Sequence, residues 1–350
     1  MRNYPVLDGQ RDAFKALVAD YGTQYADWLT VKPFSGEEAD RAAASRLISG
    51  KNAAMPVDRI SIATGGHHGC MVALLAAGLS GKVVATEDLS YPAFADICRL
   101  LGITLIACAT DEYGLIPSVL EDACVKHGVR GVYIMPTVHN PTGRVVPLSR
   151  REELIAVARK HGLMILDDDA YGFLDETGLP NFAQLAPELG WYVYSVSKPL
   201  APDIKVAYMA SPAGTQEAVS EAIKLTTSNP SSFFTSLVSE LIRRGDFDEL
   251  VRQKRAEGRR RQALVRARLQ GVSITAHPNS WHLWVKLPTG RTSGEIAGAL
   301  SKDGVGVIPG IAFSGNGFVG NDHIRIALGS EPDDLKLLSA VDVVARHFRL

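Results

Sequence analysis

The sequence has no excess of charge of either sign and no long hydrophobic run. Its 350 residues carry 37 lysines and arginines against 38 acidic residues, a formal net charge of −1 at pH 7. This balance argues against a nucleic-acid-binding surface and against electrostatic membrane binding. No apolar run reaches the roughly 18–20 residues that span a bilayer, and the charged N-terminus lacks the apolar core of a signal peptide. We therefore expect a cytoplasmic protein without nucleic-acid or membrane partners.

Cysteine is also scarce, and its spacing excludes the common metal motifs. The four cysteines form no C-x-x-C pair, and no histidine lies near them at the spacing of a metal site. Most of them lie in apolar stretches. We therefore expect reduced cysteines in the core and no bound metal. The residues are Cys70, Cys98, Cys108 and Cys124.

Short apolar runs alternate with amphipathic stretches from about residue 60 to 212. This alternation is typical of a mostly parallel sheet covered by helices on both faces. About seven strands are expected, and the short connection between the last two would let one strand run antiparallel. They are RISIAT, KVVATE, ITLIACA, GVYIMP, LMILDDD, WYVYSVS and KVAYMAS.

The pattern changes after residue 213. A long helical stretch (214–243) and a basic, solvated amphipathic helix lead into a smaller α+β region. We expect three parts: residues 1–45 as an N-terminal arm and part of the small domain, 46–240 as the large domain, and 241–350 as the small domain.

Lys198 stands between the strand WYVYSVS and the strand KVAYMAS. Pro199 and Pro202 forbid a helix between the two strands, so the lysine lies on a stiff turn at a strand end. The chemistry of α/β proteins is usually placed at such ends. A lysine there is either a surface residue with its amine in solvent or a nucleophile.

Two more strand ends carry features that suit a ligand. In ATGGHHG, Gly65, Gly66 and Gly69 separate a strand from a helix start, where bare N–H groups can hold a phosphate. The pattern is not G-x-G-x-x-G, so it does not predict dinucleotide binding; tight turns alone also explain it. Tyr91 follows the next strand, either half-buried or as a flat surface for an aromatic ligand.

The remaining strand ends are polar as well. Asn140 precedes Pro141, which indicates either a simple turn or a carboxamide aimed at a ligand. Asp167, Asp168 and Asp169 end an apolar strand, and because burying several carboxylates together is costly, at least one of them should have a cationic partner. A phosphate, an aromatic ring, a basic ring nitrogen and an attacking lysine together indicate pyridoxal 5′-phosphate.

The order HNPTG, DDDAY and SVSK-PLAP resembles the class I/II aminotransferases of fold type I. The resemblance covers residue 58 to the C-terminus and is nearest to the aminotransferase-like domains of MocR-type regulators and to 2-aminoadipate aminotransferases. It implies an α/β fold type I enzyme of amino-acid metabolism. It also implies a homodimer, with an active site at the dimer interface.

The resemblance also implies roles at the reacting end of the cofactor. Lys198 would form the Schiff base. Asp168, three residues before Tyr171, would hold the proton of the ring nitrogen, while Asp167 and Asp169 would face away or begin the next loop. Tyr171 and Asn140 would bond the phenolic oxygen, and Tyr91 would stack on the ring.

A second set of residues is assigned to the cofactor phosphate and to the substrate. The resemblance places Gly66, His67, Ser195 and Lys205 on the phosphate. Arg325, in HIRIALG, would hold the substrate α-carboxylate as a bidentate fork, with Asn140 beside it.

The sequence departs from the family pattern in the phosphate region. Lys205 stands where the family has arginine, which predicts weaker cofactor retention because lysine is a point charge. His67 and His68 replace the usual polar pair; a histidine there is a proton shuttle, a stacking group or an idle ring.

Three other assignments rest on resemblance. Tyr25, in a short N-terminal arm, and the stretch 226–234 would contribute to the partner subunit's phosphate. Trp281 and His282 are either near the substrate or in the core of the small domain.

The leading hypothesis is transamination between an L-amino acid and a 2-oxo acid. The same cofactor residues also suit a lyase, cyclase, decarboxylase or amino-acid oxidase. A sensor domain is disfavoured because the roughly 55 residues before the first strand are not basic. Ser195-x-x-Lys198 also matches a penicillin-binding motif, but the serine lies in a strand and no K-T-G follows.

Overall fold

The structure is a computed structural model that describes residues 5–21 and 32–348. Tyr25 lies outside the described residues. No helix within the described ranges is long and apolar enough to cross a membrane. The four cysteines are buried free thiols. Among the described residues, no group of three or more potential ligand side chains could hold a metal ion.

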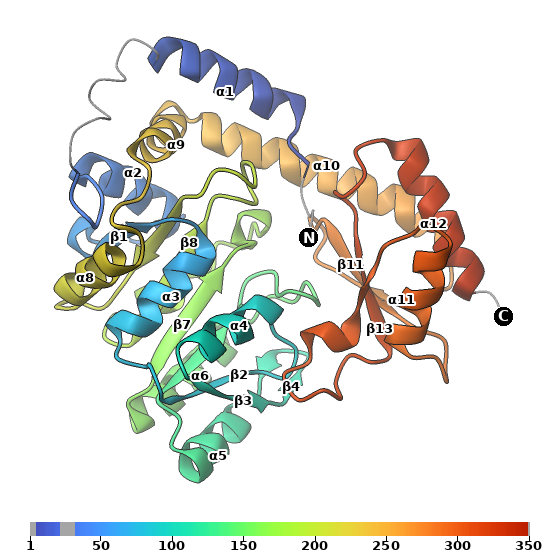
Figure 1. The fold of residues 1–350 in the computed structure, drawn as a ribbon, viewed down its shortest axis with the longest axis horizontal. Helices are drawn as coiled ribbons and strands as arrows, with labels where there is room; N and C mark the ends of the chain where they lie inside the picture. The colour runs from blue at the N-terminus through green and yellow to red at the C-terminus, as the bar shows by residue number, and fades with distance from the viewer. Residues whose placement is uncertain (1–4, 22–31, 349–350) are drawn as a thin grey trace.

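The large sheet has seven strands in the order β1-β9-β8-β7-β6-β2-β3 (Figure 1). All neighbouring pairs are parallel except those made by β9, which runs antiparallel to β1 and β8. The prediction of about seven mostly parallel strands is therefore confirmed, and the one antiparallel strand is β9. The bounds are β1 (Ile60–Ala63), β2 (Val83–Glu87), β3 (Thr104–Cys108), β6 (Gly131–Ile134), β7 (Met164–Asp169), β8 (Gly190–Ser195) and β9 (Ala207–Ala210).

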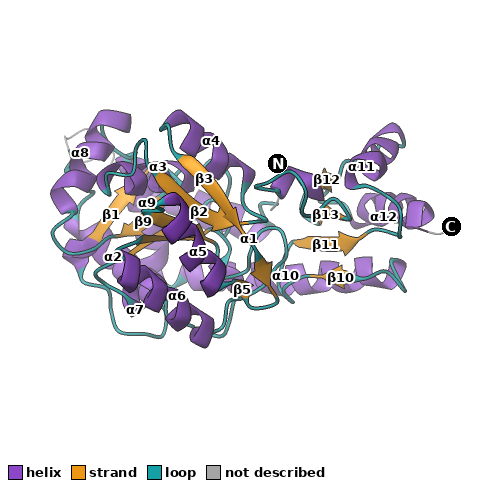
Figure 2. Cartoon of the chain, turned by 90° about the horizontal axis from the view of Figure 1, so that it is seen from below, coloured by secondary structure: helices purple, strands orange, loops and turns teal. Residues whose placement is uncertain are grey.

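Helices cover both faces of this sheet, as Figure 2 shows. Because a parallel sheet is buried on both sides, its strands are apolar along their whole length. One face carries α3 (Gly66–Ala76), α4 (Pro92–Leu100) and α8 (Gln216–Thr227). The other face carries α2 (Glu38–Ser49), α5 (Pro117–His127), α6 (Leu148–His161) and α7 (Phe182–Leu185).

Short elements fill the connections of this layer. They are the hairpin β4 (Thr110–Asp111) and β5 (Gly114–Leu115), and the 3₁₀ turns η2 (Val57–Arg59) and η3 (Gly172–Leu174).

The predicted helical stretch 214–243 is two helices, which corrects the sequence reading. α8 ends at Thr227, and α9 (Ser232–Arg244) begins after a turn. Ser228 adopts a φ of 66° and Pro230 follows two residues later. Proline lacks an N–H and disfavours a helical residue before it, so the helix cannot continue.

The smaller α+β unit is built on a four-stranded antiparallel sheet in the order β10-β11-β13-β12. Its elements are β10 (Ile274–Thr275), β11 (His282–Lys286), α11 (Ser293–Lys302), β12 (Ile308–Pro309), η4 (Gly310–Phe313), β13 (His323–Ala327) and α12 (Asp334–Phe348). The predicted division at residues 45 and 240 stays a proposal. In the structure α2 crosses residue 45 and α9 crosses residue 240.

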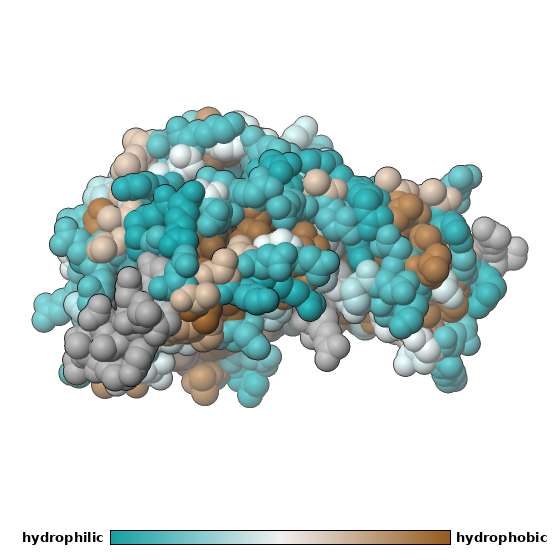
Figure 3. All heavy atoms as spheres, turned by 90° about the horizontal axis from the view of Figure 1, so that it is seen from above, coloured by the Kyte–Doolittle hydropathy of each residue, from teal (hydrophilic) through white to brown (hydrophobic). Residues whose placement is uncertain are grey.

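The basic segment forms α10 (Asp246–Arg268), which runs from the large sheet to the small one, and α1 (Asp8–Tyr21) packs against it (Figure 1). Its outward arginines pair with acids, for example Arg260 with Glu257 and Asp334. The face seen from above in Figure 3 is mainly hydrophilic. These pairs agree with the predicted solvated helix. Its inner side, however, buries Lys254 and Arg261.

Candidate active site

A cavity of about 310 Å³ lies at the carboxyl ends of the strands of the large sheet. Ligand pockets begin at about this volume. All nine residues predicted to hold the cofactor line it, together with five others. The lining consists of Thr64, Gly65, Gly66, His67, Tyr91, Met135, Asn140, Asp168, Ala170, Tyr171, Ser195, Ser197, Lys198 and Lys205.

One end of the cavity is an anion cradle made of backbone and small side chains. Gly65 adopts a φ of +86° and leads into the N-terminus of α3, whose first N–H groups have no partner within the helix. A Cβ on Gly66 would lie 3.2 Å from the Cβ of Ser195, so a larger residue would crowd the cradle. Lys205 adds positive charge at this end.

Ser197 is a lining residue that the sequence reasoning missed. Its hydroxyl lies 3.0 Å from that of Ser195. Both serines precede Lys198 in the S-x-S-K run, and residues two apart at a strand end share a face. This spacing was the signal that could have identified Ser197.

Asp168, on β7, lines the same cavity. Its Oδ2 accepts a hydrogen bond of 2.6 Å from the Tyr133 hydroxyl. Burial raises the pKa of Asp168 to about 6, the nearby charge of Asp169 adds to this, and the Tyr133 bond opposes it. A buried carboxylate of this kind suits a cationic ring nitrogen, which would favour its charged form.

Asp167 and Asp169 lie on the opposite face of β7, as strand alternation predicted. Asp167 accepts a 3.1 Å hydrogen bond from the backbone N–H of Phe182. Asp169 accepts one of 2.6 Å from the Tyr192 hydroxyl. Burial raises the pKa of Asp167 to about 8 and that of Asp169 to about 6. Hydroxyl and amide donors, rather than cations, therefore bond these carboxyl groups.

The two histidines of the glycine turn differ in their surroundings. The Nε2 of His67 lies 2.6 Å from the Tyr91 hydroxyl at the cavity wall. Burial lowers the pKa of His67, and the charges of Lys198 and Lys205 lower it further, so its ring is neutral at pH 7. His68 instead accepts the Thr64 N–H at 2.9 Å and lies 2.7 Å from the Thr226 hydroxyl. It is not among the lining residues.

Arg325 is fully buried on β13 and reaches the cavity wall through Asn140. Its Nη1 donates a 3.0 Å hydrogen bond to Asn140 Oδ1. The guanidinium also lies over the Phe313 ring, 5.7 Å from its centroid. Residues 185 positions apart are thus brought together by the docking of the small sheet on the large one.

Trp281 lies in the hydrophobic core, where its Nε1 donates to the Lys254 carbonyl at 3.1 Å. His282 is equally buried and its ring meets the edge of Tyr171, with centroids 5.5 Å apart. Neither residue is among those that line the cavity. Trp281 packs in the core of the large sheet and not in that of the small domain, which corrects the predicted small-domain core for this residue.

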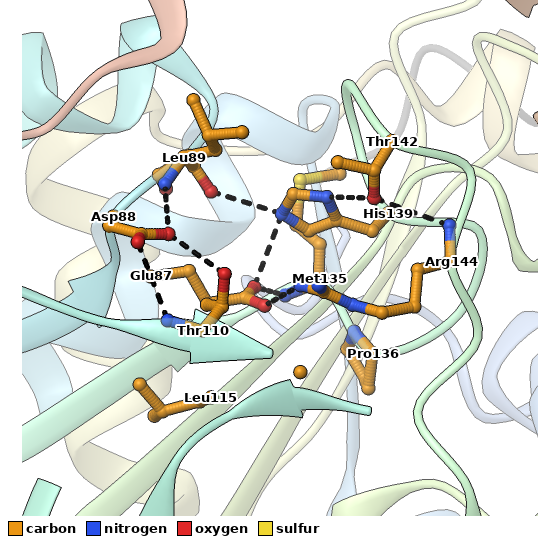
Figure 4. A network of polar contacts seen from close by, with 12 residues as sticks. Glu87, Asp88, Leu89, Thr110, Leu115, Met135, Pro136, His139, Thr142 and Arg144 are labelled. Carbon is orange, nitrogen blue, oxygen red and sulfur yellow. Dashed lines mark hydrogen bonds and ion pairs between the residues drawn. The ribbon is translucent and has the colours of Figure 1, made fainter. Parts of the chain in front are cut away.

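A buried ionic network behind Asn140 was not visible in the sequence (Figure 4). Glu87 Oε1 accepts a 2.9 Å hydrogen bond from Arg144, and its Oε2 lies 3.4 Å from His139 Nε2. His139 also lies 3.1 Å from the Leu89 carbonyl. Burial raises the pKa of Glu87, but His139 and Arg144 outweigh burial, so the pKa lies below its ordinary value.

Glu87→Gln is expected to lower the free energy of unfolding at pH 7 by about 3 kcal/mol, because Arg144 loses the buried charge it pairs with. The lowered pKa means that this stabilisation is present above the unfolded-state pKa and is lost as pH falls below about 4.5. The difference in free energy of unfolding between the variant and wild type should therefore be smaller at pH 3.5 than at pH 7.

Urea unfolding at both pH values measures this. Glu188→Gln, at an exposed ion pair with Arg159, is the control and should change stability by less than about 1 kcal/mol. Equal losses of stability in Glu87→Gln and Glu188→Gln would contradict a stabilising role of the buried Glu87–Arg144 pair.

Comparisons with known proteins show the family of this chain. The sequence model described as aminotransferase class I and II matches residues 23–341. The chain belongs to the class I and II aminotransferase family. The cofactor of this family is pyridoxal 5′-phosphate, and the residues of the cavity fit it: an anion cradle, a buried carboxylate at Asp168, the aromatic ring of Tyr91 and the amine of Lys198 all line it.

Relatives of this aminotransferase-family chain include regulators and enzymes. It is 25% identical over 283 residues to the HTH-type transcriptional regulator YdeF of Bacillus subtilis, covering 81% of this chain and 61% of the relative. It is 29% identical over 258 residues to the 2-aminoadipate transaminase of Thermus thermophilus, covering 71% and 64%. The chain therefore spans less than two thirds of either relative's length.

Solved structures share the fold over nearly the whole chain. An archaeal alanine:glyoxylate aminotransferase superposes with a TM-score of 0.89 at 20% identity, covering 100% of this chain and 89% of that one. A kynurenine aminotransferase of Pyrococcus horikoshii superposes with a TM-score of 0.87 at 21% identity, covering 99% and 89%. The fold is that of the fold type I aminotransferases.

Proposed function

We propose that this chain is a pyridoxal phosphate-dependent aminotransferase that moves an amino group between an L-amino acid and a 2-oxo acid. One observation carries the proposal. The nine residues that the family resemblance assigns to the cofactor come from separate parts of the sequence and line one cavity, and Arg325 bonds one of them. When bound, the cofactor supplies an aldehyde that accepts the amino group and a ring that withdraws electrons from it.

The chain's own residues then have separate tasks. The N-terminus of α3, with Ser195 and Lys205, holds the phosphate. Asp168 keeps a proton on the ring nitrogen. Asn140 accepts the Arg325 N–H at its Oδ1, so its Nδ2 would be the group that donates to the phenolic oxygen, with Tyr171 as the second donor.

With the cofactor bound, Lys198 would hold its aldehyde carbon and would be released as a free amine when the substrate amine takes its place. The freed Nζ would then accept the proton from the substrate Cα, the atom that must be deprotonated for transamination. Arg325 orients the substrate α-carboxylate and so directs the Cα–H bond toward this amine. Arg325 is fully buried, and an ion pair that it formed with a carboxylate would be strengthened by the exclusion of water.

The test is a visible absorbance spectrum of the purified chain, recorded without oxygen before and after each of several L-amino acids. The names of the relatives suggest 2-aminoadipate, kynurenine, alanine and leucine for this panel. Transamination predicts a visible band that bleaches with the donor and returns with a 2-oxo acid. Lys198→Ala serves as the control.

Other outcomes separate the alternatives. Bleaching that requires air would indicate an oxidase, and 2-oxo acid release with free ammonia would indicate a lyase. A chain that never acquires a visible band from added pyridoxal phosphate would refute the proposal.

Lys205→Arg is expected to tighten cofactor binding about fivefold, because a guanidinium makes two parallel bonds to phosphate where an ammonium makes one. Lys205→Met should weaken binding about tenfold. A titration of visible absorbance with pyridoxal phosphate measures both. A weaker or unchanged affinity in the arginine variant would contradict the assignment of Lys205 to the phosphate.

We also propose a cytoplasmic homodimer, as the family resemblance implies. The stretch 226–234, which would reach the partner, joins α8 to α9, and Thr226 already bonds His68 in its own chain. Sedimentation equilibrium measures the assembly, and a monomer at micromolar concentration would contradict it.

A further inference from the structure

Lys254, a residue with no role in the proposed chemistry, is fully buried beneath the loop of Lys198. It lies on α10, and its Nζ donates hydrogen bonds to the carbonyls of Lys198 at 2.8 Å and of Leu200 at 3.2 Å. The side chain of Lys198 lines the cavity. Lys254 therefore contacts the backbone of the reactive lysine directly.

A second buried side chain holds the same loop from α1. The Nε2 of Gln10 donates to the carbonyls of Pro199 at 2.8 Å and Leu200 at 2.6 Å. Gln10 is itself fixed, because its Oε1 accepts the Leu7 N–H at 2.9 Å. Three consecutive carbonyls, at 198–200, are thus bound by two side chains from distant parts of the sequence.

The neighbour of Lys254 on α10 does the same for a second active-site loop. Arg255 donates to the carbonyls of Phe173 at 2.6 Å and of Asp175 at 2.9 Å. These carbonyls belong to the segment that follows Tyr171. One turn of α10 therefore binds the backbones of the loops that carry Lys198 and Tyr171.

Folding stability alone does not account for a lysine at this position. Burial lowers the pKa of Lys254 to about 7, and the charge of Lys198 adds to this effect. Taking an ammonium out of water is costly, and an apolar side chain of similar length is often as stable or more stable in its place. What distinguishes lysine from methionine here is its ability to donate to the two loop carbonyls.

We propose that Lys254 is a positioning residue for Lys198. With Gln10 it fixes the backbone at 198–200 so that the amine of Lys198 is held toward the cavity, and α10 ties this loop to the one carrying Tyr171. This inference rests on the proposed role of Lys198. A reactive group displaced by about 1 Å loses on the order of a hundredfold in rate, so a rigid loop has a direct catalytic value.

The experiment compares Lys254→Met, Lys254→Gln and the wild-type full chain. Arg252→Met, at an exposed position two residues earlier on α10, is the matched control. Amide hydrogen exchange over residues 196–204 reports the loop without reference to any reaction. The growth rate of the visible band and its circular dichroism, after addition of pyridoxal phosphate, report the placement of Lys198.

Lys254→Met is expected to raise exchange in the loop about tenfold and to slow band growth about tenfold. Its unfolding midpoint should stay at or above that of wild type. Lys254→Gln keeps a hydrogen-bond donor without the charge, so its exchange and band growth should lie between those of wild type and Lys254→Met. The Arg252→Met control should match wild type. A positioning role thus alters the band and its dichroism while stability is retained, which a merely structural role would not do.

Unchanged exchange, band growth and dichroism in Lys254→Met would overturn the inference. If that variant does not fold, Lys254→Gln decides it by the same criteria. A wild-type chain that never forms a visible band, but whose loop loosens in the variants, would refute the aminotransferase proposal and still support the positioning of the loop.

Discussion

Lys198→Ala is expected to lower the transamination rate by about four orders of magnitude, because the variant loses the amine that acts as the base. Among the residues that line the cavity, the other lysine is Lys205. Lys205 lies beside the anion cradle and, on the proposed assignment, binds phosphate. The variant should still bind pyridoxal phosphate without a covalent bond, through the cradle and Asp168. Single-turnover amino transfer, followed by absorbance, measures the loss.

Two controls separate loss of the amine from loss of structure. Lys224→Ala, at an exposed site on α8, should retain wild-type activity. A small added amine should restore part of the rate to Lys198→Ala, because it can supply the missing base from solution. A variant that keeps more than about 1% of wild-type activity without added amine would contradict the role of Lys198.

Asp168→Asn is expected to lower the rate about 100- to 1,000-fold, the usual effect of removing one buried electrostatic group from an active site. An amide cannot hold a proton on a ring nitrogen, so the electron-withdrawing power of the ring falls. The Tyr133 hydroxyl can still donate to the amide oxygen, and the fold should therefore be retained.

The adjacent residue provides a matched control on the same strand. Asp167 lies on the other face of β7, and its pKa of about 8 means that it is mainly protonated at pH 7. Asp167→Asn then replaces one neutral group by another, and its oxygen can still accept the Phe182 N–H. Its rate should stay within about threefold of wild type. Equal losses in the two variants would contradict the assignment of Asp168.

The sequence alone determined the large sheet and most of the residues around the cavity. Short apolar runs that alternate with amphipathic helical stretches indicate a parallel sheet. Parallel strands bring their carboxyl ends to one edge of the sheet. Lys198, just before Pro199 and Pro202, and Asp168, three residues before Tyr171, could therefore be placed without coordinates. Alternation along β7 also separated Asp168 from its two acidic neighbours.

Only the tertiary structure decided which distant side chains meet. The pairing of Glu87 with Arg144 depends on the order of β2 and β6 in the sheet, and that of Arg325 with Asn140 on how the small sheet docks. The contact of Lys254 with the Lys198 carbonyl needs α10 to pass beneath the loop. Local periodicity indicates which face of a helix or strand is buried. It does not indicate which other element packs against that face, because this depends on the order of strands in the sheet and on packing.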